Sequence, residues 1–189
     1  PWLRKLVPDI NLAYVSFYTK LKGDQTIGAS LRYFSLGNIT FTDNAGNEIG
    51  QFNPNEYAID VAYARKLSEF FSGGIALRYI HSNLTGGILV ENNATKPGNS
   101  VAADISATYR NTEMESGGKD ATRAVGLNIS NIGSKISYTE TGVKDFIPIN
   151  LRLGPALTLK LNDYNELTFL VDFNKLLVPT PPIYSDSLS

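Results

Sequence analysis

Two runs of sequence decide the fold: LRLGPALTLKL at residues 151–161 and ELTFLVDFN at residues 166–174. In both runs apolar residues alternate with small or polar ones, which is the pattern of a β-strand with one apolar face. The polar residues NDYN at 162–165 predict the turn that joins the two runs into a hairpin. Each arm has about ten residues, the length with which a tilted strand crosses the hydrocarbon layer of a bilayer. Pro155 removes one ladder hydrogen bond, so we expect a bulge or a kink there.

The same pattern recurs along the rest of the chain. Alternation predicts further strands at residues 9–21, 26–36, 57–65, 73–84, 101–110 and 122–132, which gives about eight antiparallel strands in all. Most odd-numbered strands are followed by short turns, including a Gly-rich one at residues 111–120. Most even-numbered strands are followed by longer connections, including a protruding hairpin around residues 43–47 and an irregular loop at residues 85–100. Outer-membrane barrels show this asymmetry between tight periplasmic turns and long external loops.

Composition excludes several classes of protein. The 189 residues, which we expect to form one domain over residues 1–189, carry 17 basic and 18 acidic side chains, so the charge balance predicts no nucleic-acid partner. The absence of cysteine rules out disulfides and thiolate metal sites. No apolar run approaches the roughly 20 residues of a membrane helix. The first residues contain no apolar signal-peptide core, so we expect a mature or truncated piece that holds an incomplete segment of the barrel.

The residues opposite the apolar ones distinguish a membrane barrel from a soluble sandwich. A sandwich usually turns Lys, Glu and Thr to water, whereas here this face is mostly small with interspersed Arg and Asp, which suits a crowded interior. We therefore predict an all-β, transmembrane, antiparallel up-and-down β-barrel in the cell outer membrane, with its apolar face toward lipid. A soluble sandwich domain, and an ion path lined by the charges, stay open as alternatives. The predicted charge network of the lumen consists of Arg32, Asp60, Arg78, Asp104, Arg152 and Asp172.

The sequence offers little for catalysis or metal binding. His81 is the only histidine, and a zinc site needs three or four ligands. A catalytic pair of His81 and Ser82 is discounted because neighbours on a strand point to opposite faces. We therefore predict no catalytic residue, no cofactor and no metal site, and a protein that is not an enzyme.

Apolar residues in otherwise polar loops are the predicted partner contacts. The loops concerned follow Leu36, Leu84 and Val178. The candidate contact residues are Ile39, Phe41, Ile88, Leu89 and Val90.

Three stretches carry a resemblance to a known family: ASLRYFSLGNITFTD at 29–43, YAIDVAYARKLSEFFSGGIALRYIHSNL at 57–84, and IPINLRLGPALTLKLNDYNELTFLVDFNKLLVPTPP at 147–182. Together they resemble the PorV family of outer-membrane barrels of the Bacteroidota type IX secretion system, which is related to the FadL fatty-acid transporters. The resemblance implies a FadL-like barrel of about fourteen strands, of which this segment is the middle portion.

The resemblance also implies a function without catalysis. Members of such a family engage the SprA translocon, receive cargo proteins through a C-terminal signal domain, and deliver them to the surface attachment complex. The alternative is a FadL-type outer-membrane channel for hydrophobic small molecules. A channel of that kind requires an apolar pocket in the lumen and a kinked strand that opens to the bilayer, and Pro155 is the candidate for the kink.

Overall fold

A computed structural model of the chain describes residues 10–42, 45–87, 89–90, 93–139 and 144–177. Over these residues the chain is built from strands, turns and irregular connections. None of the described residues forms a helix that is long and apolar enough to span a bilayer. The strands are β1 Asn11–Leu21, β2 Gln25–Ser35, β3 Ile39–Thr42, β4 Glu48–Phe52, β5 Asn55–Lys66, β6 Phe71–Asn83, β7 Leu89–Val90, β8 Asn93–Ala94, β9 Gly98–Ser116, β10 Lys119–Gly133, β11 Asn150–Asn162, β12 Asn165–Leu170 and β13 Phe173–Leu176.

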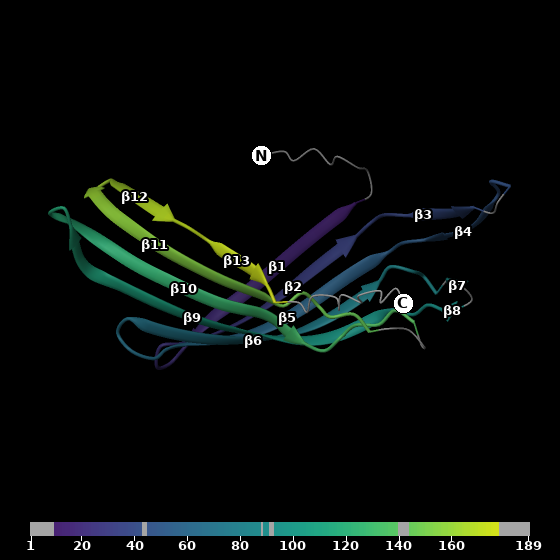
Figure 1. Ribbon diagram of the computed structural model, residues 1–189, viewed down its shortest axis with the longest axis horizontal. Coiled ribbons are helices and arrows are strands. Elements are labelled where there is room, and N and C mark those ends of the chain that lie inside the picture. The colour runs from purple at the N-terminus through teal and green to yellow at the C-terminus, as the bar shows by residue number, and fades with distance from the viewer. Residues whose placement is uncertain (1–9, 43–44, 88, 91–92, 140–143, 178–189) are drawn as a thin grey trace, which may run out of the picture.

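The long strands form one antiparallel meander in the order β1-β2-β5-β6-β9-β10-β11-β12, with β13 also paired to β11. Figure 1 shows this sheet as a curved surface with the short turns gathered at its left end. The two small ribbons, β3–β4 and β7–β8, extend to the right, from the end where the long connections lie. The prediction of about eight up-and-down antiparallel strands is therefore confirmed.

Three connections differ in detail from the predictions. The Gly-rich turn predicted at residues 111–120 contains only Gly117 and Gly118, because both have positive φ (63° and 75°) and a two-residue hairpin turn needs nothing more. The loop predicted as irregular at residues 85–100 contains the ribbon β7–β8 and the start of β9. The hairpin predicted around residues 43–47 is the ribbon β3–β4, although Asp43 and Asn44 lie outside the described residues.

The strand register collects the apolar residues on one face, which we call the outer face. Val61 lies opposite Ala29 and Leu77, and Ile105 lies opposite Ile75 and Ile129. Leu77 is 66% exposed, and its neighbours on this face are similarly open. Among the described residues no second sheet covers this face, since the other two sheets are the small ribbons. This exposed apolar face does not fit a soluble sandwich, whose strands bury their apolar side against a second sheet.

Pro155 interrupts the partner strand of β11 but introduces no bulge. β11 keeps one register with β10 across Pro155. On its other side β12 and β13 share one register on either side of Pro155, and the register shift of this pairing lies further along, between Lys160 and Asn162. Val171 N donates to Pro155 O at 3.1 Å, but the return bond of this pair cannot form because proline has no N–H. The predicted bulge at Pro155 is therefore absent: the partner strand is divided into β12 and β13 where the bond is missing, and the register is the same on both sides.

Candidate functional site

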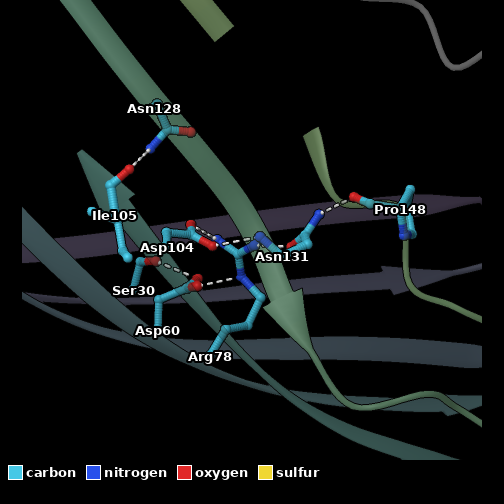
Figure 2. Close-up of polar contacts among 8 residues, drawn as sticks. All are labelled: Ser30, Asp60, Arg78, Asp104, Ile105, Asn128, Asn131 and Pro148. Atoms are coloured by element: carbon cyan, nitrogen blue, oxygen red, sulfur yellow. Dashed lines mark hydrogen bonds and ion pairs between the residues drawn. The ribbon is translucent and has the colours of Figure 1, made fainter. Parts of the chain in front are cut away.

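The face opposite the outer face, which we call the inner face, carries a cluster of polar side chains from five adjacent strands. Figure 2 shows Asp60, Asp104 and Asn131 around the guanidinium of Arg78, with Ser30 beside Asp60. We call this set the arginine cluster. It consists of Ser30 on β2, Asp60 on β5, Arg78 on β6, Asp104 on β9 and Asn131 on β10.

Arg78 binds two carboxylates at once. Its Nε donates to Asp60 Oδ1 at 2.5 Å, and its Nη2 donates to Asp104 Oδ2 at 3.0 Å. The side chains of Arg78, Asp60 and Asp104 are only 17%, 11% and 16% exposed. Charge-assisted hydrogen bonds of this kind are strong where water is largely excluded.

Neutral donors complete the coordination of both carboxylates. Ser30 Oγ donates to Asp60 Oδ2 at 3.0 Å, and the backbone N of Asn131 donates to Asp104 Oδ1 at 2.8 Å. Each of the four carboxylate oxygens therefore accepts a hydrogen bond, as a buried charged group requires. Because every member comes from a different strand, the cluster fixes five neighbouring strands in one register.

The predicted charge network lacked two members of the cluster, Ser30 and Asn131, and Asn131 is the one that strand alternation does not place on the inner face. Odd-numbered residues of β10 such as Ile129 face outward, but a bulge lies between Ile129 and Ile132, and Asn131 has a φ of 61°. The bulge turns the Asn131 side chain to the inner face, where its amide oxygen accepts from Arg78 and its Nδ2 donates to Pro148 O at 3.0 Å. The available signal was the three-residue step between Ile129 and Ile132, which breaks the alternation.

Register explains why the other predicted charges do not join the cluster. Arg32 lies opposite Tyr14, and its Cζ is 5.9 Å from the centroid of the Tyr14 ring. Arg152 lies opposite Asn174, and its Nε donates to Asn174 Oδ1 at 2.9 Å. The Asp172 carboxylate lies over Gly154, where a Cβ would overlap its Oδ1. The pairing predicted for Arg32, Arg152 and Asp172 is therefore absent from the described ion pairs, and only Arg78, Asp60 and Asp104 come together.

Aromatic residues gather at both ends of the outer face. At the end with the long connections Tyr57 stacks on His81, with 4.8 Å between ring centroids. His81 Nδ1 and Tyr79 Oη both lie within hydrogen-bonding distance of Asn99 Oδ1, at 2.8 and 2.7 Å. Ser82 points to the inner face instead and donates to Glu56, so His81 and Ser82 form no catalytic pair. The described residues contain no group of three or more His, Cys, Asp or Glu side chains suited to a metal ion.

A cavity of about 480 Å³ lies on the inner face beside the arginine cluster. It is bounded by strands β2, β5 and β6 and by the connection between β10 and β11. Its lining mixes apolar and charged side chains and includes Arg32, Phe34, Ile80, Tyr138, Phe146 and Ile147.

A family model described as "Type IX secretion system protein PorV" matches residues 1–183. The chain belongs to the PorV family. No curated protein matches the sequence. Membership of the PorV family makes the chain a component of the type IX secretion system and implies partners within that system.

In this member of the PorV family, the two ribbons that hold the described contact candidates, β3–β4 and β7–β8, extend from one end of the sheet (Figure 1). Ile39 is 42% exposed on β3, and Phe41 on the same strand is half-buried. Leu89 and Val90 form β7, but their side chains lie outside the description, as do Ile88 and the loop after Val178.

Proposed function

We propose that the chain is part of a transmembrane β-barrel of the outer membrane that takes part in protein secretion without catalysing a reaction. It binds an SprA-like translocon, receives cargo proteins through their C-terminal signal domains, and passes them to the surface attachment complex. The observation that carries this proposal is the match of the PorV family over residues 1–183. The continuous exposed apolar face of the meander supports the membrane location.

The dimensions of the outer face fit a bilayer. Phe71 and His81 lie ten positions apart near the two ends of β6. At about 3.4 Å per residue and a strand tilt of about 40°, they stand about 26 Å apart along the membrane normal. Outer-membrane barrels carry an apolar band of about 25 Å between two girdles of aromatic residues. The pair Phe70–Tyr109 at one end and the pair Tyr57–His81 at the other have the composition of such girdles.

The ribbons at the end with the long connections are the proposed contact with the translocon and cargo. Replacing Ile39 by Ser, or deleting residues 88–90, is expected to lower the SprA-like partner recovered with the full-length protein by about tenfold or more, because a few apolar anchors dominate most interfaces. The measurement is affinity purification from detergent-solubilised outer membranes, with quantification of co-eluting translocon and cargo.

The matched control is Tyr164→Ser. Tyr164 is 95% exposed in the turn between β11 and β12, at the opposite end of the sheet from the ribbons (Figure 1). This variant is expected to recover the partner as the wild type does. Undiminished recovery with both ribbon variants would refute the proposed contact surface.

The second candidate function is a FadL-type channel for hydrophobic small molecules. The apolar part of the 480 Å³ cavity, around Ile80 and Ile147, favours it. Arg32 and Arg78 in the same lining argue against an apolar path, and β10 and β11 stay paired across Pro155, which gives no gap between these two strands. Uptake of labelled fatty acid in a deletion strain separates the two: impaired uptake with intact secretion supports the channel.

A further inference from the structure

The connection between β10 and β11 folds back onto the inner face. We call its two described arms, residues 134–139 and 144–149, the inner strap. The arms pair with each other through two backbone hydrogen bonds between Ile136 and Asp145, of 2.9 and 2.8 Å. Ile136 and Ile147, one from each arm, are 7% and 8% exposed and pack with Ala102 of β9. A chain whose apolar residues are mostly exposed thus buries a small apolar core under this strap.

Polar contacts hold the strap against β6 and β9 of the inner face, and one of them continues to β5. Tyr138 Oη donates to Ser82 Oγ on β6 at 2.9 Å, and Ser82 donates in turn to Glu56 on β5 at 2.6 Å. On β9, Ser100 Oγ donates to Ser134 O at 2.7 Å. Ser82 is 1% exposed as a result.

Glycine makes room for this contact. A Cβ at Gly98 would lie 2.8 Å from Ile136 Cγ1 and 2.9 Å from Tyr138 Cε1, closer than Cβ atoms approach. Gly98 has no positive φ, so its backbone conformation does not require glycine. The space that it leaves to the strap is the physical reason for a glycine there.

In the described part of the chain, Asn131 is the member of the arginine cluster that hydrogen-bonds to the strap. Asn131 accepts a hydrogen bond from Arg78 with its amide oxygen and donates one to Pro148 O with its amide nitrogen (Figure 2). One amide thus joins the arginine cluster to the strap arm of residues 144–149. The left-handed conformation of Asn131 is one that asparagine tolerates better than most residues.

We propose that the inner strap covers the inner face. Held in place by Asn131, the strap closes the space along β5, β6 and β9 at the end with the long connections. Solutes that enter along the inner face from the end with the long connections would meet the strap before they reach the arginine cluster. The inference goes beyond the proposed function, because it concerns access to the interior and requires no partner.

The test is the rate at which a membrane-impermeant thiol reagent labels single cysteines in the full-length protein in outer membranes, with any other cysteine replaced. Ser82→Cys is expected to react about tenfold or more slowly than Lys135→Cys, because Ser82 lies under the strap whereas Lys135 is exposed on it. Adding Asn131→Gly keeps the backbone conformation but removes the clamp, and should raise the rate at Ser82→Cys about tenfold.

Two further variants make the result decisive. Asn128→Gly is the matched control, since the Asn128 amide contacts Ile105 O on β9 and not the strap; it should leave the rate unchanged. Gly98→Val displaces the strap without touching the arginine cluster and should raise the rate as Asn131→Gly does. Rapid labelling of Ser82→Cys in the wild-type background would overturn the proposal. So would an unchanged rate in both Asn131→Gly and Gly98→Val, with folding verified by gel mobility without heating.

Discussion

Replacing Arg78 by Met is expected to lower the free energy of unfolding by about 3–5 kcal/mol, because it leaves two largely buried carboxylates without their cation. Asp60 and Asp104 are 11% and 16% exposed at their side chains, and Arg78 lies between them as the only positive charge that either of them pairs with among the described residues. Methionine has similar length, so the loss comes from the uncompensated charge and not from a cavity. The measurement is urea unfolding of the full-length protein in lipid vesicles, followed by fluorescence and by gel mobility without heating.

Two controls separate this effect from a general loss of arginine. Arg32→Met removes an exposed arginine of the same face and is expected to cost less than about 1 kcal/mol. Combining Arg78→Met with Asp60→Asn and Asp104→Asn removes the charges together and should restore most of the lost stability. Equal losses of stability in Arg78→Met and Arg32→Met, or no recovery of stability in the triple variant, would contradict the conclusion that the arginine cluster stabilises the five strands it joins.

The sequence was sufficient to predict which face is apolar, because side chains on a strand alternate with a period of two. Alternation alone predicts that the strands at residues 57–65 and 73–84 each have one apolar face, and Val61 and Leu77 of these strands lie opposite each other and are exposed. The alternation carries no information about cross-strand partners, which depend on register. Register places Asn174 beside Arg152, and this is why the predicted pairing of Arg152 with an aspartate was wrong.

Strand alternation could not predict the inner strap or the position of Asn131, for a different reason. Ile136 and Ile147 lie in a connection with no strand period, so nothing local distinguishes them from loop residues that contact partners. Asn131 enters the cluster only because a bulge reverses its direction, and the bulge shows in the sequence only as a three-residue step between two isoleucines. Local patterns thus predict the strands and faces of this sheet, whereas the strap and the arginine cluster on its inner face depend on contacts between segments distant in sequence.

Replacing Leu77 by Arg is expected to cost about 2–4 kcal/mol of stability in a membrane, because the charge would sit near the middle of the hydrocarbon layer. Leu77 is 66% exposed and lies on β6 roughly midway between the aromatic residues Phe71 and His81. The measurement is again urea unfolding from lipid vesicles, together with the fraction of protein that assembles into the outer membrane.

The size of this effect depends on what surrounds the outer face. In water, a change at a side chain as open as Leu77 shifts stability by no more than about 0.5 kcal/mol, so a loss of several times that value reports lipid. Phe71→Arg on the same strand and face is the depth control: near the interface the charge reaches the head groups and the cost falls to about 0–1 kcal/mol. If Leu77→Arg leaves the free energy of unfolding unchanged, the apolar face contacts water or another protein. Equal costs at Leu77 and Phe71 would exclude a depth-dependent environment, whereas a graded cost would identify the apolar face as the surface that contacts the bilayer.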